Sequence, residues 1–283
     1  MFNSEYNYTL IFNPFKRLFT DTSGTFLGVN EIKRETQVIV SITSNEDNFD
    51  DLELSLYSLL NQTVKPDRLI LWLSDEYDLS YLPYNITKYI KNGLEIKFVK
   101  NLNTYTNIIY PLKQFPKAIN VIANDCVYYA KDWLMKLYHS YIANPREIHT
   151  HIAHKITIDT NSRTPLPYAV WQKCVNNENA EYAHFAKIDG GILYPPICFS
   201  NEVFRDDIFL KNNITNPEIW LWVMGILSNK KIRIVKNHIN TIKSTRYFKD
   251  LLTDKRKQYP KYDEQIRTLI KYYSQNILPK LNL

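Results

Sequence analysis

The chain has 283 residues, of which 45% are hydrophobic and 14% aromatic, enough to bury the core of one large domain. Its three cysteines are widely spaced and include no CxxC pair, which argues against a disulfide framework and favours a reducing compartment. The N-terminal residues lack a basic stretch followed by an apolar run, and nowhere do about 18 apolar residues follow one another. We therefore expect a cytoplasmic protein without a secretory signal or a membrane span.

The net charge of +6 is unevenly distributed along the chain. Residues 230–283 hold 14 Lys and Arg against 4 Asp and Glu, and the rest of the chain is slightly acidic. Such a basic tail predicts an anionic surface as a partner, and a solvated helical face explains it equally well. Lys and Tyr recur through residues 247–273, as suits a peripheral position on the inner face of the plasma membrane. A helical dimer arm has the same pattern, and nothing in the sequence indicates a nucleic-acid partner.

The first half of the chain alternates between predicted strands and helices. Short apolar runs predict buried strands at residues 37–44, 68–74, 95–100 and 119–124. Apolar residues at helical spacing predict helices within residues 50–63 and 131–145. Because nearly all-apolar strands alternate with helices, we expect an α/β fold with a mostly parallel sheet that is covered on both faces.

The second half begins with a polar, loop-rich stretch over residues 156–188. Further strands are predicted at 189–196 and 231–236. Between them, Asn216-Pro217-Glu218 opens a helix with an N-cap, a proline at the first helical position and an acid in the first turn. Residues 245–283 have helical character. We divide the chain into a lead-in segment (1–36), one α/β domain (37–240) and a basic helical tail (241–283).

Polar clusters follow several of the predicted strands: Thr43-Ser44, Ser74-Asp75-Glu76 and Asn124-Asp125-Cys126. In open α/β sheets the ligand binds at the carboxyl ends of the strands, where these clusters fall. Ordinary turn or capping chemistry explains each cluster alone, but their occurrence at corresponding strand ends indicates a binding site. The chain has neither GxGxxG nor GxxxxGK[ST], which excludes the dinucleotide fingerprint and the P-loop and disfavours a nucleotidyltransferase.

Several stretches of the sequence resemble one known family. They are SITS at 41–44, SLLNQTVKPDRLILWLS at 58–74, IANDCVYYAKDWLMKLYHSY at 122–141, IHTHIAHKI at 148–156, LPYAVW at 166–171, GGILYPP at 190–196 and EIW at 218–220. Together they are similar to the bacterial family-2-like glycosyltransferases of GT-A fold that build surface polysaccharides. The resemblance covers residues 37–230, and its most specific part is the stretch at 58–74.

The resemblance implies a GT-A fold and an enzyme that moves a sugar from a nucleoside-diphosphate sugar to a hydroxyl of a glycan or lipid-linked acceptor. A UDP-sugar is favoured as donor, and the transfer would be inverting. By the same likeness Thr43, Ser44 and Asp75 would lie near the base and ribose. Asn124 and Asp125 would lie near the ribose–diphosphate, where the family binds Mn²⁺ or Mg²⁺, and Asp125 would be the metal ligand.

The resemblance also implies roles for residues of the second half. Gly190-Gly191 would let the backbone approach the donor or acceptor, and Glu218 would be the general base that deprotonates the acceptor. The favourable interaction of an acid with a helix N-terminus explains Glu218 equally well. Trp171 suits stacking on an acceptor sugar ring, and it also suits a loop anchor packed on the core.

The chain departs from the family's pattern mostly on the diphosphate side. Asn124-Asp125-Cys126 stands where the family tends to show three acids, although a hard cation prefers oxygen ligands to a neutral thiol. Thr106-Asn107 replaces a basic pair, Ile152 replaces an arginine, and Pro217 replaces the first of two acids. The alternative function is therefore a catalytically silent relative that binds a nucleotide, a glycan or a partner enzyme.

Other residues offer positive charge or metal ligands. Lys155, Arg163 or a base of the tail could neutralise leaving phosphates in place of a metal. His149, His151 and His154 lie close together in sequence, and on a strand His149 and His151 face the same way, as zinc ligands would. No thiolate or fourth ligand has the spacing to complete such a zinc site.

Overall fold

The computed structural model of the chain describes residues 10–11, 26–32, 34–159, 161–162, 164–239, 242–244 and 260–281. Most of the expected lead-in segment, Arg163 and much of the expected tail lie outside these residues. Within the described part of the chain, no helical segment combines the length and the apolar character needed to span a bilayer.

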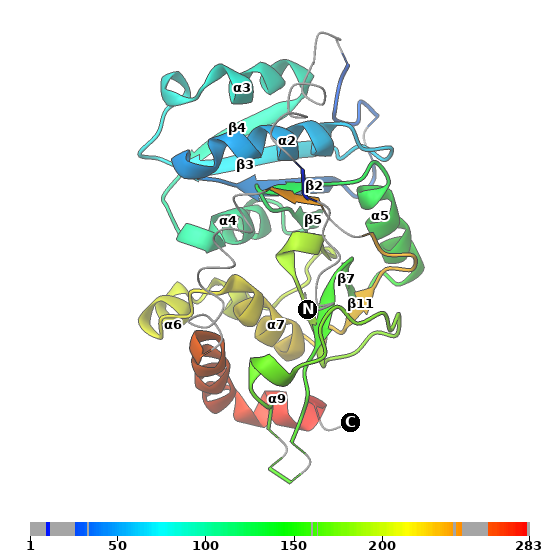
Figure 1. The fold of residues 1–283 in the computed structure, drawn as a ribbon, viewed down its shortest axis with the longest axis vertical. Helices are drawn as coiled ribbons and strands as arrows, with labels where there is room; N and C mark the ends of the chain where they lie inside the picture. Colours follow the sequence, from blue (N-terminus) through cyan, green and yellow to red (C-terminus); the bar gives the residue numbers. More distant parts are fainter. Residues whose placement is uncertain are drawn as a thin grey trace.

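A seven-stranded sheet forms the centre of the molecule, in the order β11-β7-β10-β5-β2-β3-β4 (Figure 1). Its strands are β2 (Val38–Thr43), β3 (Arg68–Ser74), β4 (Leu94–Val99), β5 (Ile119–Ile122), β7 (Ile148–Thr150), β10 (Ile192–Tyr194) and β11 (Ile232–Ile234). β2, β3, β4 and β5 are parallel, as are β7 and β11, whereas β10 is antiparallel to both of its neighbours. The predicted mostly parallel sheet is therefore confirmed.

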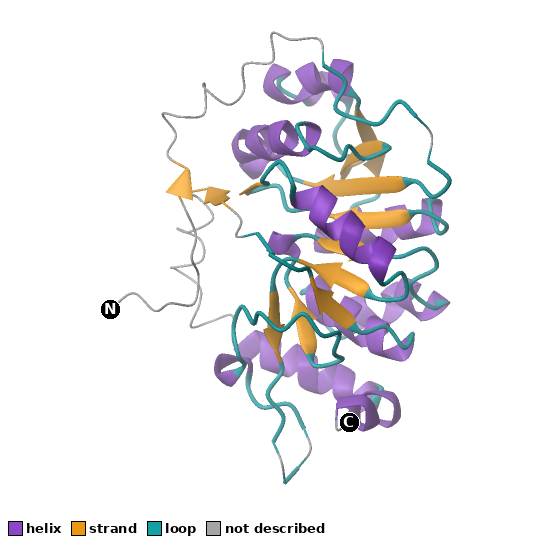
Figure 2. Cartoon of the chain, turned by 90° about the vertical axis from the view of Figure 1, so that its right-hand side faces the viewer, coloured by secondary structure: helices purple, strands orange, loops and turns teal. Residues whose placement is uncertain are grey.

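Helices cover both faces of the sheet, as predicted (Figure 2). They are α2 (Phe49–Leu60), α3 (Tyr84–Thr87), α4 (Thr106–Gln114), α5 (Trp133–Ala143), α6 (Asp206–Lys211), α7 (Pro217–Leu227) and α9 (Ser274–Leu281), with a further helix over residues 260–272. Smaller sheets join β1 (Leu10–Ile11), β12 (Ile242–Ser244) and β6 (Val127–Tyr128), and β8 (Ala153–Lys155) with β9 (His184–Ala186).

Strand β3 shows why these apolar runs form the central layer. Leu69 and Leu71 pack in the core beneath α2 and α5, whereas Ile70 and Trp72 pack on the opposite side beneath α4. Successive side chains of a strand point to opposite faces, so a strand that is buried on both faces must be apolar throughout.

Polar side chains on α2 hold the loop that follows β5. Ser55 Oγ donates to the carbonyl of Asp125 at 2.7 Å and accepts from the amide of Val127 at 3.1 Å. Gln62 Nε2 donates to the carbonyl of Ala130 at 2.9 Å. Because backbone groups that leave the sheet need new partners, these side chains fix the loop on which Asp125 lies.

Helix α7 begins as the sequence predicts. The side-chain oxygen of Asn216 accepts from the amides of Glu218 at 2.8 Å and Ile219 at 3.4 Å, and Pro217 takes the first helical position. This cap satisfies amides that have no partner within the helix, and it fixes the point at which Glu218 leaves the backbone.

The helices of the described tail, residues 260–272 and α9, pack on α7 and belong to the body of the molecule (Figure 1). Ile266, Leu269 and Ile277 are at most 4% exposed and share one hydrophobic core with α7. Lys280 Nζ donates to the carbonyl of Ile226 at 2.6 Å, at the C-terminal end of α7. The tail therefore stabilises the helix that carries Glu218.

Candidate functional site

Two adjoining cavities lie where the segments after β2, β3, β4 and β5 meet. The first, here called the amide cavity, has a volume of about 340 Å³. It is lined by Thr43, Ser44, Asn45, Asn48, Ser74, Glu76, Tyr77, Asn101, Asn103, Thr104, Thr106 and Asp125. The second, the lysine cavity, has a volume of about 290 Å³. It is lined by Thr43, Thr104, Asn107, Ala123, Asn124, Asp125, Lys187, Ile188, Asp189, Asn216, Pro217, Glu218 and Tyr262.

The two cavities share Thr43, Thr104 and Asp125. Thr43 Oγ1 donates to the carbonyl of Trp72 at 2.8 Å, so its hydroxyl ties β2 to β3 at the sheet edge. Asp125 Oδ2 accepts from Ser44 Oγ at 2.7 Å and from Asn48 Nδ2 at 3.2 Å. The predicted residues Thr43, Ser44 and Asp125 are thus brought together.

The ionised form of the Asp125 side chain is disfavoured by burial. Burial raises the pKa of Asp125 above its ordinary value, while the hydrogen bonds from Ser44 and Asn48 act in the opposite direction. A carboxyl group held in this way destabilises the fold when it ionises. Groups whose pKa is shifted by burial in this way are common at functional sites.

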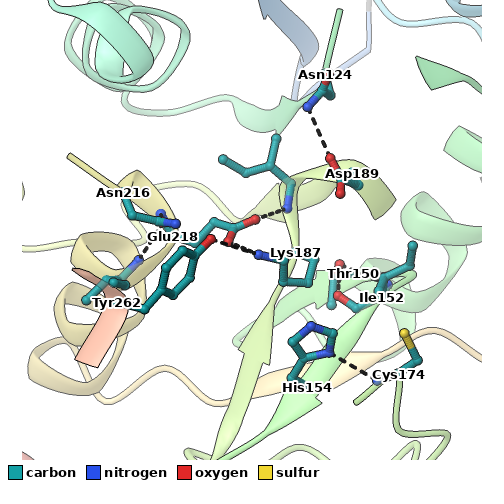
Figure 3. A network of polar contacts seen from close by, with 12 residues as sticks. Asn124, Thr150, Ile152, His154, Cys174, Lys187, Asp189, Asn216, Glu218 and Tyr262 are labelled. Atoms are coloured by element: carbon teal, nitrogen blue, oxygen red, sulfur yellow. Dashed lines mark hydrogen bonds and ion pairs between the residues drawn. The ribbon is translucent and has the colours of Figure 1, made fainter. Parts of the chain in front are cut away.

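The sequence Asn124-Asp125-Cys126 forms a turn that explains its amide. Asn124 Oδ1 accepts from the amide of Cys126 at 2.9 Å, a side-chain bond that mimics a backbone turn. Asn124 Nδ2 donates to Asp189 Oδ1 at 3.1 Å and so links the turn to the second half of the chain (Figure 3). An acid at position 124 would lose this donor and would face Asp189 as a like charge.

Cys126 has the chemistry of a neutral thiol. Burial raises the pKa of its thiol, and the nearby Asp125 and Asp51 raise it further. Because the thiolate is the form that binds metals, Cys126 does not replace the acid that the family shows here.

Glu218 lies in the wall of the lysine cavity and is 8% exposed. Its Oε2 pairs with Lys187 Nζ, and its Oε1 accepts from the amide of Ile188 at 2.8 Å (Figure 3). Lys187 Nζ also lies 3.5 Å from the hydroxyl of Tyr262, which comes from the C-terminal helix. Glu218, the predicted base, therefore lies in a cavity wall, and its carboxylate forms an ion pair with Lys187.

The charge states of this group follow from its contacts. Burial alone would lower the pKa of Lys187, but the adjacent Glu218 carboxylate and the nearby Tyr262 raise it well above its ordinary value. Burial raises the pKa of Tyr262 to about 12, although Lys187 acts to lower it. Lys187 is thus a buried cation, and Tyr262 is a neutral hydroxyl.

The C-terminal helix also fixes the start of α7. Gln265 Oε1 accepts from the amide of Asn216 at 3.0 Å, and Gln265 Nε2 donates to Thr215 Oγ1 at 3.2 Å. The ring of Tyr262 lies 4.6 Å from that of Tyr168. These contacts connect the tail to the residues that line the lysine cavity.

Other predicted residues lie elsewhere. Asp75 is exposed, donates its amide to the carbonyl of Val99 at 2.9 Å and lines neither cavity. Lys155 pairs with Glu181 at 2.6 Å and lines neither cavity either. The resemblance implies that Asp75 contacts the donor. In the structure its sequence neighbours Ser74 and Glu76 line the amide cavity, and Asp75 does not.

The glycine pair has a packing reason. A Cβ atom on Gly190 would lie 2.7 Å from the backbone nitrogen of Ile152, and one on Gly191 would lie 2.3 Å from the ring of Trp133. Gly191 also has φ +76°, a conformation that other residues rarely adopt. Trp133 Nε1 donates to the carbonyl of Gly190 at 2.8 Å. Close approach of the protein's own core accounts for both glycines.

Trp171 is 3% exposed, and its indole N–H donates to the carbonyl of Leu166 at 2.8 Å. Its ring contacts those of Tyr168 and Phe185, at centroid distances of 5.1 and 5.3 Å. Of the two explanations, the loop anchor fits these contacts, because stacking on a sugar requires an accessible ring face.

The three histidines have partners other than a metal. His149 shares a hydrogen bond with Ser140 Oγ at 2.9 Å, and His151 bonds the carbonyl of Trp133 at 3.0 Å. Burial lowers the pKa of His154 to about 2 and those of His149 and His151 to about 4, so all three are neutral. Among the residues that the structure describes, no three His, Cys, Asp or Glu side chains form a group that could hold a metal ion.

Lys187, Asp189 and Tyr262 line the lysine cavity and were not predicted from the sequence. Asp189 carried a signal, because an acid directly precedes the glycine pair at the start of a strand. Lys187 and Tyr262 carried none, since each becomes a site residue only when segments distant in sequence pack together.

Comparisons with known proteins reveal only distant likeness. No family model matches the chain, and no curated protein matches it. A solved structure of GalNAc-T7 with UDP, GalNAc and Mn²⁺ is 10% identical over 82% of this chain, with a TM-score of 0.46. TarS from S. aureus in complex with UDP is 12% identical over 74%, with a TM-score of 0.45. A CMP:2-keto-3-deoxy-manno-octonic acid synthetase complexed with CTP is 10% identical over 79%, with a TM-score of 0.42.

The chain spans 53% of the GalNAc-T7 chain, 61% of the TarS chain and 100% of the synthetase chain. Identities of 10–12% with TM-scores below 0.5 denote no more than a remote likeness of fold. The chain is an α/β protein with two adjoining cavities at the ends of its parallel strands.

Proposed function

We propose that this protein is a glycosyltransferase of GT-A type that moves a sugar from a nucleoside-diphosphate sugar to a hydroxyl group. The single observation that carries the proposal is the position of Asp125, which lines both cavities at the carboxyl ends of the parallel strands. Open α/β sheets bind ligands at this edge. A nucleoside in the amide cavity would direct its diphosphate and sugar past Asp125 towards Glu218.

The size and chemistry of the cavities support this assignment. The amide cavity, about 340 Å³, lies in the range of small-molecule sites and is lined mainly by amide and hydroxyl side chains. Such groups donate to and accept from the edges of a nucleobase and the hydroxyls of ribose. A UDP-sugar is our favoured donor, and a glycan or lipid-linked sugar is our favoured acceptor, as the sequence resemblance implies.

In the proposed reaction the acceptor oxygen attacks the anomeric carbon from the side opposite the diphosphate. The new C–O bond forms while the bond to the leaving diphosphate oxygen breaks, which inverts the anomeric configuration. Glu218 takes the proton of the acceptor hydroxyl, a role that fits its position in the cavity wall. The leaving nucleoside diphosphate keeps the electron pair of the broken bond.

A divalent cation would be held differently from the family's expected pattern. Cys126 is unsuitable as a ligand, and Asn124 uses its side-chain oxygen within the turn. Asp125 and Asp189 supply carboxylates to the lysine cavity, and Mg²⁺ often needs only one or two carboxylates when it also binds substrate phosphates. The residues therefore fit a cation that binds together with the diphosphate, whose charge it would neutralise.

The domain division and location also remain proposals. Residues 37–240 would be the catalytic unit, and the basic tail, 241–283, would meet an anionic surface at the inner face of the plasma membrane. The charge count supports this, since residues 230–283 hold 14 Lys and Arg against 4 Asp and Glu.

The first test is isothermal titration calorimetry with UDP, GDP and CDP, each with Mn²⁺, with Mg²⁺ and with a chelator. We expect one of the three nucleotides to bind, and we expect Mn²⁺ or Mg²⁺ to strengthen the binding of that nucleotide. The metal ion alone should show no binding to the protein. Absence of binding for all three nucleotides under all conditions would refute the donor site.

The second test is turnover of the sugar nucleotide whose base binds. Glu218→Gln keeps the size of the side chain and removes the base, so we expect a loss of about 10²–10⁴-fold in kcat. Glu147→Gln, which removes an ion pair with Arg233 outside both cavities, is the matched control and should change kcat little. Equal loss in both variants would remove Glu218 from the base role.

The alternative function is a catalytically silent relative that binds a nucleotide, a glycan or a partner. The observation that favours it is that both carboxylate oxygens of Glu218 already have partners, Lys187 Nζ and the amide of Ile188. Cys126→Asp separates the two functions. In a working enzyme the added acid should raise metal affinity, whereas in a silent relative it should change neither metal affinity nor turnover.

A further inference from the structure

The charges around the two cavities are unbalanced. Among the described residues that line them, Lys187 is the only Lys or Arg, whereas four carboxylates lie in their walls. These acids are Glu76, Asp125, Asp189 and Glu218. A leaving diphosphate needs positive charge nearby, so the state of Lys187 decides how well this site holds a donor.

We propose that Lys187 exchanges partners when the donor binds: its ammonium leaves Glu218 for the diphosphate, and this frees Glu218 to act as the base. The inference rests on the proposed function and deepens it. One residue would thereby link donor binding to release of the base, so that Oε2 of Glu218 is open to the acceptor only when a donor is present.

The geometry allows this exchange without unfolding the site. The amide of Lys187 donates to the carbonyl of Ile152 at 2.9 Å, which fixes its backbone. Its side chain is a flexible stem with a point charge, a form that suits phosphate binding. Lys187 and Asp125 line the same cavity of about 290 Å³, so an occupant of that cavity lies within reach of both.

Glu218 is arranged to lose one partner and keep the other. Its Oε1 is held by the amide of Ile188 at 2.8 Å, while only Oε2 pairs with Lys187. Departure of the ammonium leaves the carboxylate oriented by the backbone bond. Oε2 is then free of the ammonium and open to accept the proton of the acceptor hydroxyl, as a general base requires.

Two aromatic rings lie close to the ammonium of Lys187. Lys187 Nζ lies 5.5 Å from the ring centre of Tyr262 and 5.6 Å from that of Phe185. The Tyr262 hydroxyl, at 3.5 Å, accepts from the same nitrogen. Cation–π contacts and this hydroxyl hold the ammonium in its resting position, and they do not involve the Glu218 carboxylate.

The inference makes an unusual prediction about binding. Glu218→Gln removes the resting partner of Lys187 and releases its charge, so this variant should bind UDP about 10-fold more tightly than the unaltered protein, even as turnover falls. Lys187→Met should bind UDP about 10-fold more weakly. Both titrations are run by calorimetry with a chelator present, so that metal binding does not contribute.

Uridine is the matched ligand. It carries the same base and ribose without phosphate, so its affinity should be the same in the unaltered protein and both variants. Lys155→Met is the matched variant, because Lys155 pairs with Glu181 outside both cavities. It should leave UDP affinity unchanged.

Folding is controlled with the double variant Lys187→Met/Glu218→Gln, which leaves no unpaired charge. If Lys187→Met fails to fold, the double variant should still bind UDP more weakly than Glu218→Gln alone. Equal UDP affinity in the unaltered protein and in Glu218→Gln would overturn the exchange while leaving the donor site intact. Failure of the unaltered protein to bind any nucleotide would refute the proposed function itself.

Discussion

The amide cavity and the lysine cavity are built in different ways. The amide cavity is formed by polar stretches that follow β2, β3, β4 and β5, with no lysine or arginine among its lining residues. The lysine cavity joins those strand ends to residues 187–189, 216–218 and 262, and its central acid is paired with a cation. One cavity therefore follows from strand order, and the other depends on how the second half and the tail fold back.

The largest expected effect is on the lysine cavity. Lys187→Met leaves Glu218 buried without its partner, and breaking a buried pair in this way costs about 3–5 kcal/mol of unfolding free energy. Urea unfolding should recover much of that loss in Lys187→Met/Glu218→Gln. If Lys187→Met is as stable as the unaltered protein, the Lys187–Glu218 pair does not contribute to the free energy of unfolding. The lysine cavity would then not differ from the amide cavity in this respect.

The next effect tests how the loop of Asp125 is held. Ser55→Ala removes the partner of both the Asp125 carbonyl and the Val127 amide, so we expect a loss of about 1–3 kcal/mol. Ser162→Ala, at an exposed loop position, is the control and should change unfolding little. An equal effect of the two substitutions would show that α2 does not support the amide cavity.

A smaller effect tests the tail. Gln265→Ala removes the partner of the Asn216 amide, and we expect a loss of roughly 1 kcal/mol together with a lower kcat. The matched control is Gln114→Ala, whose exposed side chain bonds Lys97 and lines neither cavity. Unchanged kcat in the Gln265 variant would mean that the tail packs on the site without positioning it.

The smallest expected effect is an increase in stability, and it concerns Asp125 in the wall of the amide cavity. Burial raises the pKa of Asp125 above its ordinary value of 3.8, so the native state binds this proton more tightly than the unfolded state does. The stability that Asp125 contributes is present at low pH and is lost as pH rises through its folded pKa. Asp125→Asn should therefore raise Tm at neutral pH, by about 2–4 °C for each kcal/mol regained.

The measurement for Asp125→Asn is thermal unfolding between pH 4.5 and 8, where the advantage of the variant should grow with pH. Asp78→Asn provides the contrast. Hydrogen bonds from Ser80 lower the pKa of this exposed acid, so its replacement should not stabilise the protein. A pH-independent difference for Asp125→Asn would contradict the cost assigned to its charge.

Much of the first half was predictable because its signals are local. The run predicted at 68–74 matches β3, the run predicted at 119–124 contains β5, and Asn216-Pro217-Glu218 marks the start of α7. Thr43, Ser44 and Asp125 were found together for the same reason: the carboxyl ends of neighbouring parallel strands must meet at one edge.

The lysine cavity was less predictable because its contacts are not local. Glu218 was identified, but its partner Lys187 lies 31 residues earlier and Tyr262 lies 75 residues beyond that lysine. Trp171 and Gly191 looked like ligand contacts because bulky rings and glycines occur in such sites, yet Phe185 and Trp133 explain them by packing. Sequence pattern does not distinguish a ring that meets a sugar from one that meets the core.

The position of Tyr262 and Gln265 has a consequence for how the protein is made. A ribosome at work completes the sheet and Glu218 well before it adds residues 262 and 265, at about 5–20 residues per second. Until those residues have emerged, the lysine cavity lacks one wall and the Asn216 amide lacks its partner. The nascent chain therefore passes through a stage in which the residues of the amide cavity have been made and the lysine cavity is incomplete, until the helix over residues 260–272 docks on α7.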